Sequence, residues 1–450
     1  MVMLNAATYD RDQVEFPGAY RVREMVLVSD QNPQVRHDIS ALFIQFDVFE
    51  SVWSPTISGQ LVMVDTTNMI KNVPILGEET LHVTITDGTR DMTLRMRVYA
   101  IKDRQHVRHG VLQYTLALCS EEMWLDSFVR ISQSYHLKKF EDNVRTILQN
   151  QLRSQKPIIT GATKDIRSVV IPYWSPIHAI TWMGNRAQAA EDTYSAGNFV
   201  FFETIDGFKW VAVDNLLDST VNRPYCTLFY DPMRPSVQGL TRYDRRMQGA
   251  KGDVLMIEEW SVVKSFDFLD NARNGMYANR TRTIDIVNRT WQDTDQNYFQ
   301  QFYDTPHLKG LDGAAARPFC SYKNEAPGWP EAHMRVAIKH KGLFNDEPDG
   351  NSQIEKWLPS KLSQMQQLEN FKLVCTLPGH IGLTAGMVVN HVAPNPQDTS
   401  VNQSPGPDHD FSGEYLVTNL RRSFGEHRHT IVLEMVKDSR AYDPSATIGP

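Results

Sequence analysis

The sequence predicts a mainly β protein with α+β parts. Apolar and polar residues alternate with period two through residues 41–119, which is typical of strands that bury one face. Helical spacing replaces this pattern near residues 139–152, and the alternation returns from Val254 onward. At 450 residues the chain is too long for one ordinary core, so we expect roughly two to four domains.

Residues 41–119 read as consecutive strands with short connections. The alternating apolar residues are Leu42, Ile44, Phe46 and Val48, then Leu81, Val83 and Ile85, and then Met92, Leu94, Met96 and Val98. An Asp87-Gly88 pair predicts the turn between the last two of these strands. About five such strands with one apolar face predict a barrel or a sandwich, and we assign residues 1–125 to this first β-barrel.

An α+β module is expected at residues 126–220. Apolar residues at helical spacing predict an amphipathic helix over residues 139–152. A second helix should begin at Ser175-Pro176, because serine caps free N–H groups and proline fits the first helical position. Short strands are predicted at residues 168–171 and 198–204.

The last part of the chain predicts a second β-barrel that is discontinuous in sequence. Strand patterns run from Val254 to Arg289, broken by a turn-prone cluster at residues 271–275. Further strands are predicted at residues 371–375, 387–392, 414–420 and 430–436. Since neither group alone has enough strands, we expect one barrel from residues 221–295 and 370–440.

The segment between these two groups, residues 296–369, is predicted to be an irregular insertion. Its one expected helix runs from Lys361 to Asn370, after Pro359. Residues 394–412 should form a long polar loop, and residues 441–450 a flexible tail.

Composition narrows the classes of function. The formal net charge of −7 and a pI near 6.1 lack the basic footprint of a protein that reads nucleic-acid sequence. The N-terminus lacks the pattern of a signal peptide, and no apolar run approaches the roughly 18 residues of a spanning helix, so no membrane insertion is expected. The four cysteines, Cys119, Cys226, Cys320 and Cys375, are far apart and are expected to be free buried thiols in a reducing compartment.

Three pairs of adjacent carboxylates raise the alternative of a cell-wall hydrolase. They are Glu78-Glu79, Glu121-Glu122 and Glu258-Glu259. Neighbours on a strand point to opposite faces, so we favour solvated or interface carboxylates over a catalytic pair. No nucleophile, phosphate-binding or zinc-protease motif is present, so we predict no enzyme and no cofactor.

Histidine and arginine clusters leave two further alternatives. His427 and His429, with His391 and His409 in the same region, could hold a metal, but surface histidines near a hairpin turn are favoured. One arginine cluster is Arg242, Arg245 and Arg246, and another is Arg280, Arg282 and Arg289. Interleaved Asp244 and Asp285 favour subunit salt bridges over contact with DNA.

Five tryptophans are candidates for interface anchors, with core packing about as well supported for each. They are Trp53, Trp174, Trp260, Trp291 and Trp357.

Four segments, in order, resemble the baseplate hub proteins of contractile-tailed bacteriophages. They are residues 49–65 continued through 68–70 and 74–79; residues 140–152, 172–176 and 198–208; residues 266–278 with Asp285; and residues 412–418 with 433–438. The last also resembles the hub part of type VI secretion spike proteins. The family-motif and assembly candidates are Trp53, Ser54, Pro55, Ser58, Gly59, Gly77, Glu78, Asp267, Gly275, Tyr277, Gly413 and Tyr415.

The resemblance implies a structural protein of the virion tail baseplate, assembled in the host bacterial cytoplasm. It implies a homotrimeric ring in which each chain supplies two tube-type barrels, so that three chains match a six-fold tail tube. The implied partners are the central spike below, the tube or tube-initiator protein above, and baseplate wedge proteins. Genomic DNA would pass through the ring without specific binding.

The first segment, with its Ser-Pro turn, is then the first hairpin of the first barrel, and we expect Gly59→Val to impair assembly. The alternative is the hub of a type VI secretion or bacteriocin spike. A secretion spike normally continues into a β-helical needle, whereas this sequence stops at Pro450 soon after its closing strands, so we expect the phage hub.

Overall fold

The computed structural model describes most of the chain. The described residues are 17–66, 69, 75–164, 166–191, 197–230, 254–286, 288–319, 333–339, 354–395, 407–408, 410–425 and 428–440. The tail predicted at residues 441–450 and most of the loop predicted at 394–412 lie outside them.

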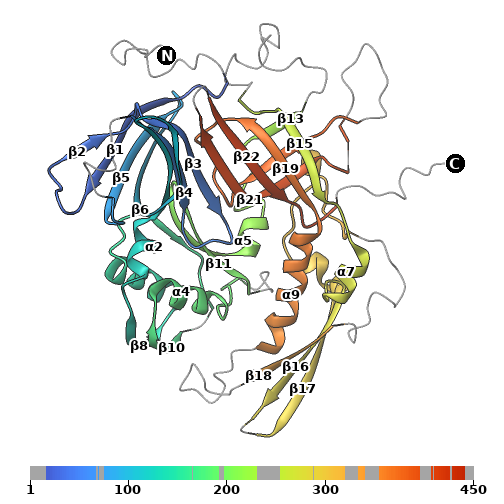
Figure 1. The fold of residues 1–450 in the computed structure, drawn as a ribbon. Coiled ribbons are helices and arrows are strands. Elements are labelled where there is room, and N and C mark those ends of the chain that lie inside the picture. Colours follow the sequence, from blue (N-terminus) through green and yellow to red (C-terminus); the bar gives the residue numbers. More distant parts are fainter. Residues whose placement is uncertain are drawn as a thin grey trace.

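One 14-stranded sheet carries both β-rich regions (Figure 1). Its first region contains β1 (Arg21–Ser29), β2 (Arg36–Asp38), β3 (Phe43–Ser51), β4 (Ser58–Asp65), β5 (Glu79–Thr86), β6 (Asp91–Arg108) and β7 (Val111–Ser120), followed by the short helix α2 (Glu121–Asp126). The strands pair antiparallel in the order β3-β4-β7-β6-β5-β1-β2. The predicted fold class, mainly β with α+β parts, is confirmed.

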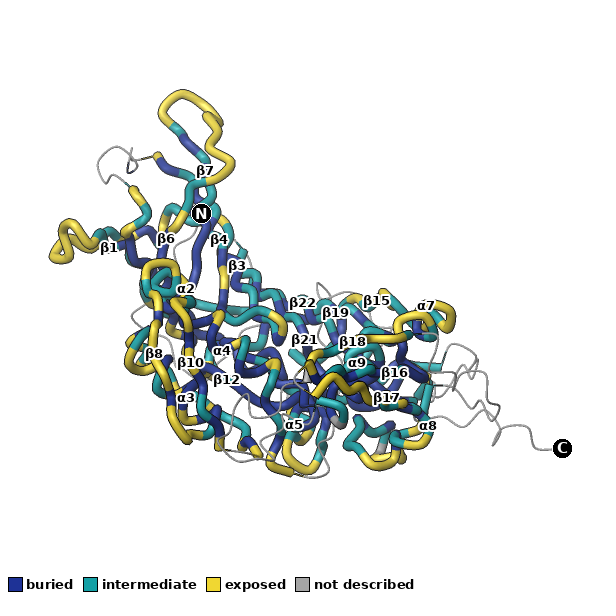
Figure 2. Tube along the Cα trace, turned by 90° about the horizontal axis from the view of Figure 1, so that it is seen from below, coloured by how far each residue is buried: buried dark blue, intermediate teal, exposed yellow. Residues whose placement is uncertain are grey.

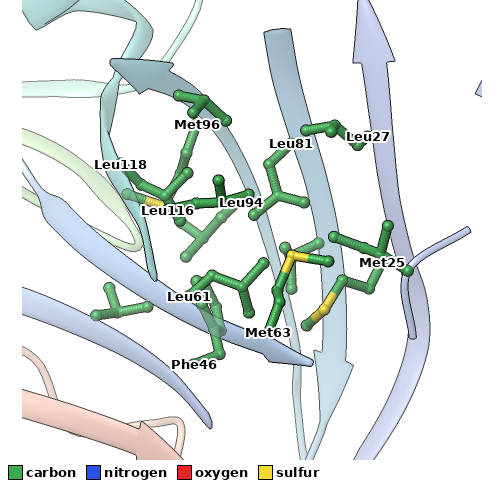
Figure 3. Close-up of a cluster of buried hydrophobic side chains, with 14 of the residues drawn as sticks. Met25, Leu27, Phe46, Leu61, Met63, Leu81, Leu94, Met96, Leu116 and Leu118 are labelled. Carbon is green, nitrogen blue, oxygen red and sulfur yellow. The ribbon is translucent and has the colours of Figure 1, made fainter. Parts of the chain in front are cut away.

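Alternate residues of these strands build the first core, as the pattern predicts (Figure 3). Leu81 and Val83 of β5 are fully buried, and Leu94 and Met96 of β6 pack in the same cluster. Ile44 is different, because it is exposed instead of sharing the buried face of β3. The β3–β4 register shifts at this residue, and a bulge turns a side chain to the other face.

The middle of the chain forms the expected α+β module. Its elements are β8 (Ile131–Lys138), α3 (Phe140–Thr146), the π-helical turn η1 (Ile147–Gln151), β9 (Ile158–Thr160), β10 (Arg167–Trp174), α4 (Pro176–Gly184), β11 (Phe199–Thr204), β12 (Gly207–Ala212) and α5 (Val213–Leu217). Ser175 caps α4 by accepting the N–H of His178, and proline occupies the start of the helix, as predicted. The apolar stripe of α3 and η1 packs with Ile180 and Trp210 into a second core.

The second β region joins strands from both sides of residues 296–369. Its strands are β13 (Thr227–Tyr230), β14 (Met256–Ile257), β15 (Glu259–Lys264), β19 (Lys372–Pro378), β20 (Val388–Val392), β21 (Gly413–Phe424) and β22 (His429–Val436). β15 pairs with β19, and β13 pairs with β14 and β20. β21 pairs with β20 and β22 and, along its second half, with β3 of the first region.

Both regions curl, but no ladder among the described residues closes either into a complete barrel. In each region, two consecutive strands pair with different parts of the sheet. β2 pairs with β1 while β3 pairs with β4. Likewise β14 pairs with β13 while β15, one residue further on, pairs with β19. Among the described residues, the two predicted barrels are therefore open, curled parts of one sheet.

Residues 268–370 contain more regular structure than the sequence predicts. The elements are α7 (Phe268–Arg273), β16 (Ala278–Asp285), β17 (Thr290–Asn297), α8 (Tyr298–Gln301), the short 3-10 turns η3 (Phe302–Asp304) and η4 (Leu311–Gly313), β18 (Met334–Lys339) and α9 (Ile354–Asn370). β16, β17 and β18 form their own three-stranded sheet, so the strands at 278–297 do not pair with the second β region.

The predicted start of the helix after Pro359 is wrong, because Pro359 lies inside α9. Proline removes one helical hydrogen bond, and packing of α9 against β16 and β17 outweighs that loss. The Pro359 carbonyl accepts the side-chain amide of Asn279 at 3.1 Å, which ties the helix to the sheet.

Three cysteines lie within the described residues, and all three are free thiols. Cys119 and Cys375 are buried and Cys226 is partly so, while Cys320 lies outside the description. Burial raises the pKa of Cys119 to about 11. Within the described residues, no helix has the length and apolar character needed to cross a membrane.

Candidate functional site

The turn between β3 and β4 lies where the two β regions and the α+β module meet. The Val52 N–H donates to the Thr418 carbonyl of β21 at 2.9 Å, and the Ile57 N–H donates to the Glu203 carboxylate of β11 at 3.0 Å. The Val52 side chain is buried in a cluster with residues of both neighbours, among them Phe202, Leu216, Ala385, Val388 and Leu416. We call residues 50–57, Glu203 and residues 418–422 the three-way junction.

Turn chemistry accounts for the serines of this motif. Ser51 accepts the N–H of Trp53 on its hydroxyl at 3.1 Å and the N–H of Ser54 on its carbonyl at 3.2 Å. The Ser54 hydroxyl donates to the Thr56 carbonyl at 3.1 Å. These bonds satisfy the backbone of a tight turn, so neither serine is arranged as a nucleophile.

A buried ion pair joins the two β regions. The carboxylate of Glu50 on β3 lies 3.1 Å from the guanidinium of Arg422 on β21, and both side chains are fully buried. Arg422 also donates to the carbonyls of His380 and Leu383, and Glu50 accepts the Ala385 N–H at 3.2 Å. Burial raises the pKa of Glu50, and the attraction of Arg422 opposes this rise.

The opposite face of the same strand pair carries a second, more exposed ion pair. Arg421 reaches Asp47 at 2.9 Å, with Asp47 buried and the arginine side chain 43% exposed. Burial by itself would raise the pKa of Asp47, but hydrogen bonds from Gln60, Gln45, Ser423 and Arg421 lower it. Successive residues of β21 therefore hold β3 on both faces.

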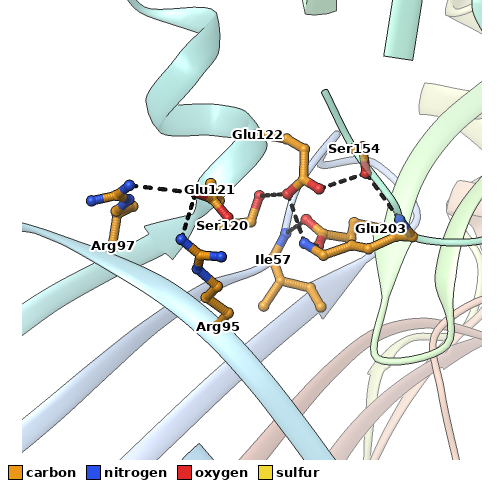
Figure 4. A network of polar contacts seen from close by, with 9 residues as sticks. Ile57, Arg95, Arg97, Ser120, Glu121, Glu122, Ser154 and Glu203 are labelled. Atoms are coloured by element: carbon orange, nitrogen blue, oxygen red, sulfur yellow. Dashed lines mark hydrogen bonds and ion pairs between the residues drawn. The ribbon is translucent and has the colours of Figure 1, made fainter. Parts of the chain in front are cut away.

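A buried charge cluster ties the α+β module to the first β region (Figure 4). Lys156 reaches Glu203 at 2.5 Å and Glu122 at 2.6 Å, and both carboxylates are almost fully buried. Ser154 donates to Glu122 at 2.6 Å. Burial alone would lower the pKa of Lys156, but the two carboxylates raise it, so the lysine stays charged.

Solvated or interface carboxylates were expected at the three adjacent pairs, and Glu78 and Glu259 are exposed, but Glu79 and Glu122 are buried inside the chain. Glu79 is buried and accepts the N–H groups of Leu76 and Gly77, each at 2.9 Å. Glu122 belongs to the cluster around Lys156. The burial of these two carboxylates depends on the groups that bind them. Alternation along a strand predicts which face a residue occupies, but it does not predict which groups pack against that face.

Two histidines that were expected on the surface are buried. His429 is fully buried and stacks on Phe424 with ring centroids 4.1 Å apart. Burial lowers the pKa of His429 well below its usual value and lowers that of His391 to about 4. His427 and His409 lie outside the described residues, within which no group of three metal-ligating side chains occurs.

The arginines of β16 form salt bridges inside the chain, where subunit salt bridges were favoured. Arg280 reaches Asp295 at 2.6 Å and Arg282 reaches Asp293 at 2.7 Å, both across the β16–β17 ladder. Directly paired residues share one face, so the register itself supplies the partners. Arg242, Arg245 and Arg246 lie outside the described residues.

The predicted assembly residues fall in four places, and two of these are in the first β region. Trp53, Ser54, Pro55, Ser58 and Gly59 lie at or beside the three-way junction. Gly59 is buried in β4, where an added Cβ would lie 3.0 Å from the Asp47 carbonyl and 3.1 Å from Met96. Gly77 has a φ of +99°, and the carbonyl of the exposed Glu78 accepts a hydrogen bond from Arg97 at 3.1 Å.

The other predicted residues belong to two separate clusters. Asp267 caps α7 by accepting the Asp270 N–H at 3.0 Å, Gly275 has a φ of +79°, and Tyr277 is buried against Phe268. At the start of β21, Gly413 has a φ of +133° beside Lys437, and Tyr415 is buried with its hydroxyl 2.9 Å from the Phe411 carbonyl. The residues of these two clusters have folding roles where they lie, and the structure does not bring the four groups together.

The candidate tryptophans divide by burial. Trp357 is buried and Trp291 is 70% exposed. Trp53 at the junction turn is 37% exposed, and Trp174 and Trp260 are intermediate. Core packing therefore explains Trp357, while Trp291 remains available for contact.

Sequence reasoning missed the charged residues that hold the junction, namely Glu50, Arg422, Lys156 and Glu203. One signal was present, because Glu203 and Glu50 interrupt strands that are otherwise largely apolar. A carboxylate at such a position requires a buried partner. The carboxylates of Glu50 and Glu203 each contact a cation and accept a backbone N–H, which suits a rigid junction. Neither of these two carboxylates is free to act as an acid or a base in catalysis.

Comparisons with known proteins give the same fold. No family model and no curated protein matches the sequence. Among solved structures, a tail protein from Neisseria meningitidis MC58 is 12% identical, with a TM-score of 0.51 over 94% of this chain and 98% of that one. The 43 kDa tail protein of prophage MuSo2 from Shewanella oneidensis is 8% identical, with a TM-score of 0.53 over 93% of this chain and 99% of that one. At these identities the likeness concerns the fold alone, and the chain has the fold of these two tail proteins along almost its whole length.

Proposed function

We propose that the protein is the hub of a contractile phage tail. Three copies form a ring that joins a three-fold central spike to a six-fold tail tube and leaves a channel for DNA. The ring lies in the baseplate, contacts a tube or tube-initiator protein on its upper face, and catalyses no reaction.

The observation that carries this proposal is the length of the structural likeness. The shared fold covers nearly all of this chain and nearly all of both tail proteins, one of them from a prophage, so it is not a common module inside an unrelated protein. The three-way junction adds support, because it fixes two curled β regions side by side in one chain. A protomer with two such regions provides six similar units in a trimer.

The charges of the described site agree with a structural role. The carboxylates of the junction are paired with cations or accept backbone N–H groups, as in a rigid connection between parts. The negative formal charge of the chain favours passage of DNA without adhesion, since each phosphate contact by lysine or arginine adds salt-dependent affinity.

Electron microscopy of the purified protein tests the proposal. We expect class averages with three-fold symmetry and six lobes, and light scattering that gives three times the chain mass of 51.5 kDa. The measurement is repeated with the spike protein encoded in the same tail gene cluster, in case the spike is needed to close the ring. A protein that stays monomeric alone and with the spike would overturn the proposal.

A further inference from the structure

The β6–β7 hairpin, residues 102–110, lies where β6 ends and β7 begins, and it projects from the body of the molecule (Figure 2). Every residue from Lys102 to Gly110 is exposed. The hairpin carries three cations, Lys102, Arg104 and Arg108, and one carboxylate, Asp103. Within the described part of the chain, none of the three cations forms an ion pair. The hairpin is therefore a basic surface whose charge the described chain does not neutralise.

The hairpin is also partly apolar. Tyr99 and Val107 are each more than half exposed, at 53% and 54%. The Lys102 ammonium lies over the Tyr99 ring, 5.9 Å from its centroid. An exposed aromatic and an exposed branched side chain beside cations that form no ion pair favour a partly apolar protein surface over the phosphates of a nucleic acid. The rest of the chain has a formal charge of −9, since the hairpin contributes +2 to the total of −7.

A surface of the opposite character is formed by β15 and α7. Among the described strands, β15 pairs with β19 alone, so its other edge has no strand partner there. Its exposed apolar residues are Val262, Val263, Phe266, Phe268 and Leu269, of which Phe266 is 74% exposed. Open edges of this kind are normally blunted by charge or covered by another element.

The charges of this second surface are net negative. Glu259, Asp267 and Asp270 are opposed by Lys264 and Arg273. The Asp267 carboxylate already caps α7, and the positive charge of Lys264 stabilises its ionised form. Glu259 and Asp270 are exposed and form no ion pair with any described residue.

We propose that the β6–β7 hairpin of one copy docks on the β15–α7 surface of the next copy. The two surfaces are complementary in charge, both are partly apolar, and they lie at opposite ends of the molecule in Figure 2. A contact between two different surfaces of one chain is head-to-tail, and such contacts close into a ring when the rotation permits. The inference rests on the proposed trimer and names the surfaces that would form it.

Charge reversal tests this contact on the full-length protein. One variant carries Arg104→Glu with Arg108→Glu, a second carries Glu259→Lys with Asp270→Lys, and a third carries all four changes. Each double variant should associate at least about tenfold more weakly, because like charges then face each other across the interface. The variant with all four changes should recover the trimer, since the charges of the two surfaces are complementary again.

Matched controls separate this effect from total charge and from misfolding. Lys138→Glu with Arg223→Glu removes the same charge from exposed cations elsewhere and should leave the trimer intact. Circular dichroism checks that each variant is folded. Light scattering across a salt series gives the association constant, which should fall with salt for the wild type.

Each outcome decides between the inference and the proposed function. The docking contact alone would be overturned if both double variants still formed the trimer. It would also be overturned if the variant with all four changes were folded but did not recover the trimer. A wild type that never forms a trimer would overturn the proposed function as well. If a short DNA duplex binds the wild type but not the hairpin variant, while the trimer is unchanged, the hairpin is a nucleic-acid contact and the inference is wrong.

Discussion

Arg422→Met should weaken the folded state far more than Arg421→Met, although the two residues are neighbours on β21. Arg422 is fully buried against Glu50, whereas the Arg421 side chain is 43% exposed. Losing Arg422 leaves a buried carboxylate without its cation and removes the guanidinium hydrogen bonds to the carbonyls of His380 and Leu383. Removing one partner of a buried pair costs about 3–5 kcal/mol of unfolding free energy, and a partly exposed pair about 0–1 kcal/mol.

Urea unfolding at pH 7.5, followed by tryptophan fluorescence and circular dichroism, measures both variants beside the wild type. Adding Glu50→Gln to Arg422→Met should recover part of the loss, because it removes the unpaired charge. The two single variants make the same substitution at neighbouring positions of one strand. They differ in the face of the sheet on which the arginine lies, so each is a control for the other.

The pH dependence gives a second test of the same pair. Burial raises the pKa of Glu50 in the folded protein, and without Arg422 only the hydrogen bond from Ala385 opposes this rise. Stability from a carboxyl with a raised pKa is present below its unfolded value and is lost as pH rises through the folded value. Arg422→Met should therefore be less destabilised at pH 5 than at pH 8. Equal losses for Arg421→Met and Arg422→Met, with no pH effect, would refute the reasoning.

Three further predictions concern other parts of the junction and its surroundings. Gly59→Val should lower the unfolding free energy by about 1–3 kcal/mol, with Ser58→Val, at an exposed neighbour, as the control in thermal unfolding. His429→Phe should flatten the stability profile below pH 6.5, because the depressed pKa of His429 makes the wild type lose stability there at up to about 1.4 kcal/mol per pH unit. Lys156→Met should cost about 2–3 kcal/mol at pH 8 and less at pH 5, where one of its two buried carboxylates can take a proton, and an unchanged urea midpoint would contradict this.

The sequence predicts those strands in which alternation is unbroken. β5 follows the pattern from Leu81 to Ile85 and β6 from Met92 to Met96, and the Asp87-Gly88 turn joins them. β1 was not predicted, and its register against β5 shifts between Val22 and Glu24. Such a shift breaks the period of two, so the pattern is short even though the strand is long.

Helix boundaries were predictable where capping chemistry sets them. Ser175 and the proline after it mark the start of α4 correctly. Pro359 marks no boundary in α9, because tertiary packing outweighs one lost hydrogen bond there. Helix propensity can be read from neighbouring residues, whereas the packing of α9 against β16 and β17 depends on residues far away in the sequence.

The candidate site was predictable as a hairpin and not as a junction. Its turn residues follow from local chemistry, whereas its partners Glu203 and Thr418 are far away in the sequence. Nothing in the local pattern names a partner at that distance. The structure also changes what we expect of Gly59→Val, since the contacts of Gly59 are inside the chain and folding should suffer before assembly.

The buried charges of the junction are better explained by geometry than by stability. A buried ion pair is on average no more stabilising than apolar residues of similar volume. Glu50 and Arg422 do specify register, because a slip of one residue between β3 and β21 would move one of them to the opposite face of the sheet. That register fixes the angle between the two β regions of the chain. A ring built from repeated copies closes only if this angle is the same in every copy, so a junction that admits one register serves the proposed hub better than a more adaptable apolar contact would.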